Sequence, residues 1–178
     1  VSGGTRKVLA GVDRIAAERL TRSHHDAPTA MAWLTADATR LMELRSVYAE
    51  SSGIRVTPFA YILRLCAIAL VRYPRLNAHF DTATNEVVTF APVHLGVAVQ
   101  TERGLVVAVI RDAQDKPLPP LAADLNRLAE AARDGTIDAP ELRGSPFTSP
   151  NFGSFGDVGG TAPLHAPAAR RAGVGAFG

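Results

Sequence analysis

The side chains that could do chemistry gather in one short segment of the C-terminal third of the chain. Ser145, Thr148 and Ser149 closely precede Asn151, which brings three hydroxyl groups near an amide. A hydroxyl can act as a nucleophile, or it can donate a hydrogen bond to an oxyanion. No Gly-x-Ser-x-Gly elbow surrounds these residues, so the pattern does not indicate a hydrolase nucleophile. From the residues alone, capping of a loop is the favoured role for these hydroxyls.

The histidines do not have the spacing of a metal site. His24 and His25 are adjacent, whereas His79, His94 and His165 lie far from them and from one another. No pair has the His-x-x-x-His or His-Glu-x-x-His spacing that brings two imidazoles to one face of a helix. We therefore expect no metal. His94 stands beside an apolar segment, and we expect a core residue with satisfied hydrogen bonds there rather than a catalytic base.

Glycines and charges exclude two further classes of function. The glycines of residues 151–160 are irregularly spaced and precede no convincing helix, so neither a phosphate loop nor a dinucleotide fingerprint is present. The net charge is +2, and the 19 basic residues are scattered along the chain. A nucleic-acid footprint would need a basic cluster, so we expect no nucleic-acid partner. An anionic small ligand is compatible with this charge pattern.

Length and composition favour one soluble domain. The chain has 178 residues, of which 47% are hydrophobic, and no apolar run reaches the roughly 18 residues of a membrane span. The first residues lack the apolar region of a secretory signal, and the single Cys66, within a helical pattern, excludes a disulfide framework. We expect a cytoplasmic protein with no membrane contact.

Two apolar runs form the centre of the predicted fold. Residues 93–99 and 105–110 are rich in valine and are joined by the polar turn 100–104, a pattern typical of two buried strands. Apolar spacing predicts amphipathic helices over 12–25 and 119–135, and a third after Asp37. Thr57 and Pro58 predict the start of a helix that is apolar nearly all round and therefore buried on most of its surface. We expect further strands at 29–37, 76–80 and 85–90, and a helical turn at 139–144.

The order of these elements predicts the fold class. Helices and strands mix without the strict alternation of a doubly wound nucleotide-binding fold. We therefore expect an α/β protein, more narrowly an α+β mixed sheet flanked by helices.

Several segments together resemble the catalytic domain of the 2-oxo acid dehydrogenase acyltransferases, also called dihydrolipoyl acyltransferases. Residues 12–28 are similar to the opening helix of that family. Residues 56–78 resemble its buried helix and end in the family's Tyr-Pro-x-Leu-Asn-Ala pattern. Residues 94–113 are similar to its two-strand signature, and 132–144 match the stretch before its Phe-Thr-Ile-Ser-Asn motif.

This resemblance implies a fold and a reaction. The fold would be a two-layer sandwich like that of chloramphenicol acetyltransferase, assembled as a homotrimer or a larger oligomer. The reaction would transfer an acyl group from S-acyl-dihydrolipoyl-lysine to CoA, with CoA as co-substrate and the lipoyl group supplied by a separate domain. A histidine would deprotonate the thiol of CoA, and a hydroxyl would stabilise the tetrahedral oxyanion. Partners would be the lipoyl domain and other components of the dehydrogenase complex.

The resemblance also assigns candidate site residues. The family's Phe-Thr-Ile-Ser-Asn motif reads Phe-Thr-Ser-Pro-Asn from Phe147, so the family's serine falls on Pro150. Thr148 and Ser149 are the candidate oxyanion donors, and Asn151 is a candidate substrate-binding residue.

Two departures from the family bear on activity. No histidine is followed by the family's x-x-x-Asp-Gly sequence, and Arg170 and Arg171 replace apolar residues of a core strand. We expect residues 1–10 to be a linker remnant and 11–178 to be a catalytic domain without its C-terminal segment. Such a chain would be an inactive piece of an acyltransferase. The alternative is a non-catalytic, trimer-forming assembly protein derived from that family.

Overall fold

A β-hairpin forms the centre of the structure, as predicted. The computed structural model describes residues 3–26, 32, 34–54, 56–81, 83–151 and 170–171. Strands β3 (Leu95–Thr101) and β4 (Gly104–Ile110) pair antiparallel, with Leu95 opposite Ile110 and Thr101 opposite Gly104. The turn is tight because Gly104 adopts a φ of 113°, which is unfavourable for residues with a Cβ atom. The two apolar runs therefore lie side by side in one sheet.

The hairpin belongs to a mixed four-stranded sheet in the order β4-β3-β5-β6. Strand β5 (Phe147–Ser149) runs parallel to β3, and β6 (Arg170–Arg171) runs parallel to β5. The prediction of a mixed sheet is thus confirmed. The arginines that replace apolar family residues do form a strand, but their side chains lie outside the described part of the chain.

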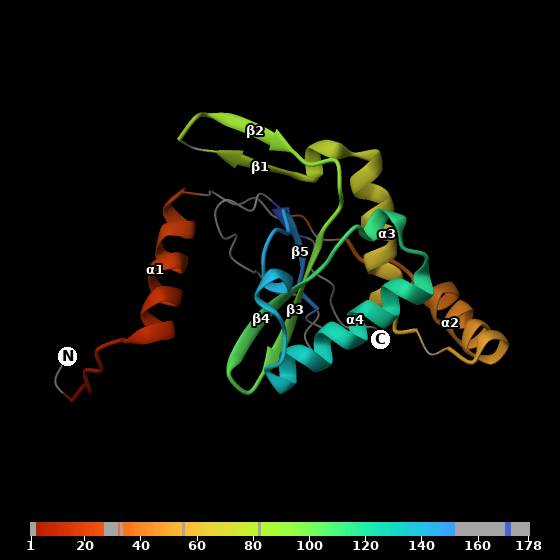
Figure 1. The fold of residues 1–178 in the computed structure, drawn as a ribbon, viewed down its shortest axis with the longest axis horizontal. Helices are drawn as coiled ribbons and strands as arrows, with labels where there is room; N and C mark the ends of the chain where they lie inside the picture. Colours follow the sequence, from red (N-terminus) through yellow and green to blue (C-terminus); the bar gives the residue numbers. More distant parts are fainter. Residues whose placement is uncertain are drawn as a thin grey trace.

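Two helices cover one face of this sheet and make the two-layer arrangement seen in Figure 1. Helix α4 (Leu118–Asp134) packs directly on β3 and β4, and α3 (Pro58–Arg72) packs on α4. Helix α3 begins where the sequence predicts: the Thr57 hydroxyl accepts a hydrogen bond of 3.3 Å from the amide of Ala60. Gly135 ends α4 in the left-handed region, with a φ of 73°.

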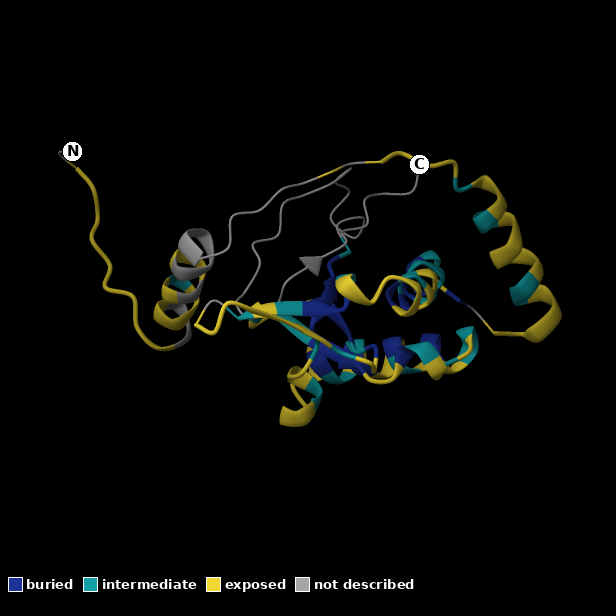
Figure 2. Cartoon of the chain, turned by 90° about the horizontal axis from the view of Figure 1, so that it is seen from above, coloured by how far each residue is buried: buried dark blue, intermediate teal, exposed yellow. Residues whose placement is uncertain are grey.

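The hydrophobic core lies between the sheet and these helices, where Figure 2 shows the buried residues. Its sheet side consists of alternate residues of β3 and β4 together with one residue of β5. These residues are Leu95, Val97, Val99, Ala108, Ile110 and Phe147. The helix side consists of Phe59, Ala60, Leu63, Ala67 and Leu70 from α3 and Leu121, Ala122, Leu125, Leu128 and Ala132 from α4. Since these residues all belong to one cluster, the core occupies a single face of the sheet.

Helix α3 is buried or half-buried over most of its length, as predicted, but one side of it is exposed. Leu65, Ile68 and Val71 are 58%, 49% and 55% exposed, so their side of the helix faces outward. This side is exposed because α4 and the sheet cover only the opposite side. An exposed apolar helix face of this kind is typical of a surface that meets another protein.

A second departure concerns the predicted strand at 29–37. Leu34–Ala38 have no regular secondary structure, while Met31 and Trp33 lie outside the described residues. Helix α2 (Thr39–Ser52) follows, as predicted, and the carboxylate of Asp37 accepts hydrogen bonds from the amide and hydroxyl of Thr39.

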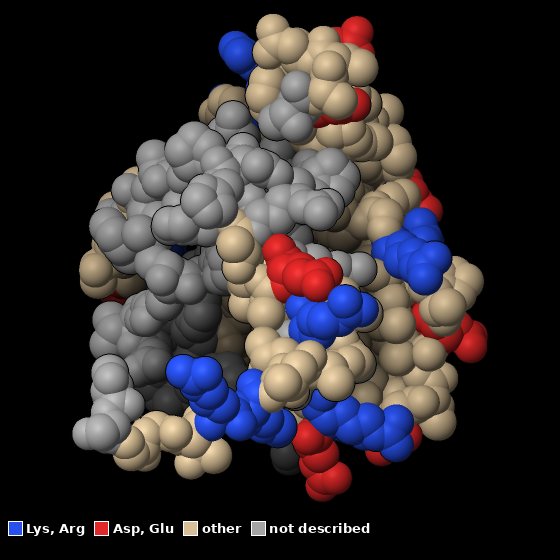
Figure 3. Space-filling view, turned by 90° about the vertical axis from the view of Figure 1, so that its left-hand side faces the viewer, with Lys and Arg blue, Asp and Glu red and all other residues tan. Residues whose placement is uncertain are grey.

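The remaining elements lie around this sandwich. Helix α1 (Gly11–Asp26) lies to the side of the sheet, and strands β1 (Ala78–Asp81) and β2 (Glu86–Thr89) form a separate hairpin (Figure 1). Short 3-10 helices span Pro74–Leu76 (η1), Ala113–Asp115 (η2) and Ala139–Leu142 (η3), the last at the predicted helical turn. Within the described ranges, no helix has the length and apolar character needed to cross a membrane. On the face that Figure 3 presents, acidic side chains lie among the basic ones.

Candidate functional site

The two candidate oxyanion donors lie on opposite faces of the sheet. Side chains of successive strand residues alternate between the faces, and residues paired across strands share a face. Ser149 pairs with Val97, a core residue, and is therefore on the helix-covered face. Thr148 pairs with Gly96, whose other neighbour Val109 is buried but lies outside the core cluster. Thr148 is thus on the face that α3 and α4 do not cover.

The Thr148 hydroxyl lies directly over Gly96. A Cβ atom added to Gly96 would be 2.8 Å from Thr148 Oγ1, 3.0 Å from Ser145 Oγ and 3.1 Å from Val107 Cγ1. Two of these three neighbours are hydroxyl oxygens of the segment that enters or forms β5. Both hydroxyl groups therefore lie close to the backbone of β3 at Gly96.

Ser145 holds the start of this segment against β3. Its Oγ lies 2.9 Å from the carbonyl oxygen of His94 and also within hydrogen-bond distance of the carbonyl oxygen of Phe147. A serine hydroxyl has one hydrogen to donate, and backbone carbonyls already accept it. Ser145 thus has the loop-capping role that the sequence left open. Thr148 is itself buried, with 6% of its surface exposed, and within the described part of the chain no hydrogen bond uses its hydroxyl.

Arg111 fixes the loop that leads into β5. Its Nη2 donates hydrogen bonds to the carbonyl oxygens of Pro140, at 2.8 Å, and Arg143, at 3.2 Å. The side chain of Arg127 in α4 reaches the same loop, because its Nη2 lies 2.9 Å from Glu141 Oε1 and this hydrogen bond raises the pKa of Arg127. Both arginines therefore tie residues 140–143 to the sandwich just before the hydroxyl-bearing segment.

His94 has the structural role that its sequence context predicts. It precedes β3, is half-buried, and its Nδ1 accepts a hydrogen bond of 3.1 Å from the amide of Asp112. The same Nδ1 lies 3.8 Å from Asp112 Oδ1. The ring is therefore used to hold the turn after β4.

The other predicted site residues lie as follows. Ser149 is fully buried, and Asn151 is half-buried at the end of the described segment. Each of these two residues takes part in an interaction and is not free. His165 and the glycines after Phe152 fall outside the described residues. Burial raises the pKa of the Cys66 thiol in α3, so this cysteine stays protonated and is a poor nucleophile. Among the residues that the structure describes, no three His, Cys, Asp or Glu side chains gather as a metal site would require.

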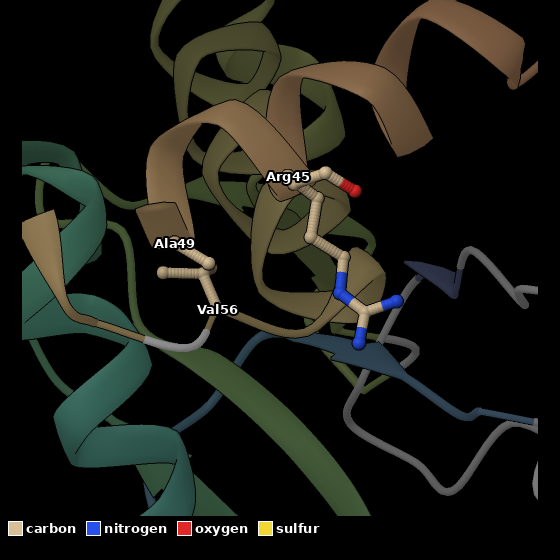
Figure 4. A pocket seen from close by; sticks show the side chains of 4 residues that line it. Arg45, Ala49 and Val56 are labelled. Atoms are coloured by element: carbon tan, nitrogen blue, oxygen red, sulfur yellow. The ribbon is translucent and has the colours of Figure 1, made fainter. Parts of the chain in front are cut away.

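A shallow pocket elsewhere does not compete with this site. Figure 4 shows it between α2 and the segment before α3, where Arg45, Ser46, Ala49 and Val56 line it. Arg45 and Ser46 are exposed, and the Ser46 hydroxyl donates to the Met42 carbonyl within its own helix. One exposed cation and one occupied hydroxyl do not form a reaction centre.

Sequence reasoning missed the part that Gly96 plays. The signal was present, because a glycine inside a strand often marks close approach of another chain segment. The residue that approaches is more than fifty positions away, at Thr148, and only the parallel pairing of β3 with β5 identifies it. The arrangement places one hydroxyl donor, that of Thr148, beside the backbone of β3. Such a donor is suited to stabilising negative charge on an oxygen.

Known proteins share this architecture over nearly the whole chain. Residues 2–177 match the family described as 2-oxoacid dehydrogenases acyltransferase (catalytic domain). The chain is 30% identical over 174 residues to the dihydrolipoyllysine-residue acetyltransferase component of the pyruvate dehydrogenase complex of Bacillus subtilis, covering 96% of the chain and 39% of that protein. It is 31% identical over 154 residues to the lipoamide acyltransferase component of the branched-chain alpha-keto acid dehydrogenase complex of the same organism, covering 84% and 36%. The chain thus spans less than half the length of these relatives.

Solved structures agree with the sequence matches. The dihydrolipoamide acetyltransferase of Azotobacter vinelandii superposes with a TM-score of 0.88 at 31% identity, over 98% of this chain and 74% of that one. That protein was studied for the roles of a serine, a histidine and an asparagine in its catalytic mechanism. A truncated catalytic core of the 2-oxoacid dehydrogenase complex of Thermoplasma acidophilum gives a TM-score of 0.89 at 26% identity, over 97% and 80% of the two chains. The predicted fold class, with the sandwich of these acyltransferase cores, is confirmed.

Proposed function

The chain belongs to the 2-oxoacid dehydrogenase acyltransferase family, and we propose that its Thr148 hydroxyl is an oxyanion donor for acyl transfer between a dihydrolipoyl group and CoA. The observation that carries this proposal is the placement of Thr148 over Gly96, on the sheet face opposite the core. Ser149 is the weaker candidate because it shares its face with the core residue Val97. The donor role therefore goes to Thr148 alone.

The chemistry follows from where charge develops. When a thiolate attacks a thioester, the carbonyl oxygen becomes an oxyanion, and a hydroxyl aimed at that oxygen stabilises the tetrahedral intermediate. Such a donor contributes about 3 kcal/mol to the lowering of the barrier in well-ordered sites. Within the described part of the chain, no hydrogen bond competes for the Thr148 hydrogen. Asn151, two residues further on, is the proposed contact to the rest of the substrate.

The base of this reaction is not assigned to any residue of the chain. The family's thiol-deprotonating histidine precedes x-x-x-Asp-Gly, a sequence that follows none of the five histidines. The imidazole of His94 is held by the amide of Asp112. We therefore expect these 178 residues to bind the thioester and polarise its carbonyl without turning it over.

Substrates and partners follow from the same family. CoA is the proposed co-substrate, and a separate domain supplies the lipoyl group. That lipoyl domain and the other components of a 2-oxo acid dehydrogenase complex are the proposed partners. The boundary at residue 10 between a linker and the catalytic domain is supported by the exposed, irregular backbone of residues 3–10 and by the start of α1 at Gly11. A homotrimer or larger oligomer is supported by the apolar surface of α3 and of the β1–β2 hairpin. We retain the cytoplasm as the predicted location.

A second function is a non-catalytic, trimer-forming assembly protein of this family. Pro150 stands where the family has its serine, and the exposed apolar residues are those that an assembly surface needs. A protein with this function would form the oligomer but would not bind the acyl substrate.

Binding of an acyl-CoA distinguishes the two functions. Acetyl-CoA, succinyl-CoA and isobutyryl-CoA, isotope-labelled at the thioester carbonyl, are mixed with the chain, and the carbonyl stretch is followed by infrared spectroscopy. With at least one of them we expect the carbonyl frequency to be lower in the bound state than in free acyl-CoA. In Thr148→Ala the frequency should return to that of free acyl-CoA, and in Thr148→Ser it should stay lowered. An oligomer in light scattering that binds none of the three is the assembly protein. A monomer that binds none contradicts both functions.

A further inference from the structure

Gly96 stands where a glycine is unfavourable by itself. It lies inside β3 between Leu95 and Val97, and a glycine in a strand interior destabilises the fold relative to alanine. Its backbone is not in the left-handed region, so the conformation does not require glycine. The residue is therefore explained by what approaches it rather than by how its backbone turns.

What approaches is a pair of hydroxyl groups. Thr148 Oγ1 and Ser145 Oγ lie 2.8 Å and 3.0 Å from the place that a Cβ atom would take. Real Cβ atoms essentially never have neighbours closer than 3.0 Å, so an alanine would displace the Thr148 hydroxyl. Ser145 is also restrained, because its hydroxyl is bonded to the carbonyl oxygen of His94 at the start of β3.

We propose that Gly96 and Ser145 are positioning residues that together set the place of the Thr148 hydroxyl on its sheet face. Gly96 supplies the space beneath the hydroxyl, and Ser145 joins the start of the β5 segment to the residue before β3. The functional part of this inference rests on the proposed function, because the position of the Thr148 hydroxyl matters to acyl transfer only if Thr148 is the oxyanion donor. The contact itself is independent of that function.

A double-mutant cycle on stability tests the contact without any substrate. Gly96→Ala is compared in the wild-type background and in Thr148→Ala, which lacks the approaching oxygen. We expect a clear loss of melting temperature in the wild-type background and a much smaller loss in the Thr148→Ala background. Equal losses in both backgrounds overturn the inference. Should Gly96→Ala alone fail to fold, recovery of the folded state in Gly96→Ala/Thr148→Ala supports the same contact, and no recovery contradicts it.

Val107 supplies the matched control. Its Cγ1 is the third neighbour, at 3.1 Å, and it belongs to β4 rather than to the hydroxyl-bearing segment. We expect the cost of Gly96→Ala to remain in a Val107→Ala background, because the Thr148 hydroxyl still meets the new methyl group. If Val107→Ala removed the whole stability loss caused by Gly96→Ala, the close contact would be with β4 rather than with Thr148. That result would overturn the proposal.

The carbonyl stretch of bound acyl-CoA tests the positioning role. We expect Gly96→Ala and Ser145→Ala to bind the thioester and to lose the lowered frequency, as Thr148→Ala does, with no added effect when combined with Thr148→Ala. A lowered frequency that persists in Gly96→Ala overturns the positioning role. If wild-type chain binds no thioester, the proposed function fails, whereas the stability cycle still decides whether Gly96 seats Thr148.

Discussion

Thr148 and Ser149 are adjacent in sequence and lie on opposite faces of the same sheet. The register of β5 with β3 places Thr148 beside Gly96 and Ser149 beside Val97, a member of the hydrophobic core. This relationship separates two hydroxyl groups that the sequence presents as equivalent. It makes Thr148 a candidate for chemistry and Ser149 a residue of the folded core.

Alanine substitutions at these two residues should therefore have different effects. Ser149 is fully buried and takes part in an interaction, so we expect Ser149→Ala to lower the free energy of unfolding by about 1–3 kcal/mol. The carbonyl stretch of bound acyl-CoA should stay as in wild type. Thr148→Ser should keep both the stability and the lowered stretch. Chemical denaturation and infrared spectroscopy measure the two effects, and loss of the carbonyl signal in Ser149→Ala would reverse the assignment.

Elements with strong local signals could be predicted from the sequence. Thr57 and Pro58 begin α3, Gly135 ends α4, and the valine-rich runs form the β3–β4 hairpin because each signal acts within a few residues. The strand predicted at 29–37 is absent from Leu34–Ala38, since alternation of apolar residues is weak where no neighbouring strand pairs. The contact of Gly96 with Thr148 required a parallel pairing between distant segments, which no local pattern encodes.

The inner and outer sides of α3 should differ in their contribution to stability. Leu63 is fully buried in the core, so we expect Leu63→Ala to lower the free energy of unfolding by about 2–5 kcal/mol. Leu65 is 58% exposed on the outer side, and Leu65→Ala should change it by no more than about 0.5 kcal/mol. Both changes keep good helix formers, so helix propensity is matched. Equal losses in urea denaturation would mean that the outer side is covered, either within the chain or by a partner chain in the oligomer.

Arg111 should control the order of the loop before β5. Arg111→Ala removes the hydrogen bonds to the carbonyl oxygens of Pro140 and Arg143, and we expect local opening of residues 140–147 to become easier by about 1 kcal/mol. Hydrogen exchange measures this change as faster exchange in that loop, with β3 unaffected. Arg143→Ala is the control, because its backbone carbonyl still accepts from Arg111. Unchanged exchange in Arg111→Ala would show that Arg127 and Glu141 hold the loop alone.

The start of α2 should depend on pH through Asp37. Hydrogen bonds from the hydroxyl and amide of Thr39 hold the pKa of this carboxyl below its ordinary value of 3.8. A folded-state pKa below the unfolded one means that the carboxylate stabilises the helix start above the ordinary pKa. That contribution is lost as the pH falls through the lowered pKa. We expect hydrogen-exchange protection in the first turn of α2 to fall below about pH 4. Asp37→Asn keeps an accepting oxygen and should abolish this pH dependence, and a transition that persists in Asp37→Asn would belong to another group.

The β1–β2 hairpin should be required for assembly. Phe80 and Val87 are paired across its two strands and are 47% and 60% exposed, so they form one apolar surface on a hairpin that is too small to be stable alone. We expect wild-type chain to form a trimer or larger oligomer in light scattering, and Phe80→Thr/Val87→Thr to shift the mass toward a single chain. Threonine preserves the strand propensity, so the hairpin itself should persist.

Leu34→Thr is the matched control for this assembly test, since Leu34 is 93% exposed but lies in an irregular segment. Removing it takes away apolar area without touching the hairpin, and we expect the wild-type mass. A double variant that keeps the full mass would move the assembly surface to another place, of which the outward side of α3, with Leu65, Ile68 and Val71, is the next to test. Circular dichroism of each variant confirms that a change in mass reflects lost association, because unfolding would also remove the helical signal.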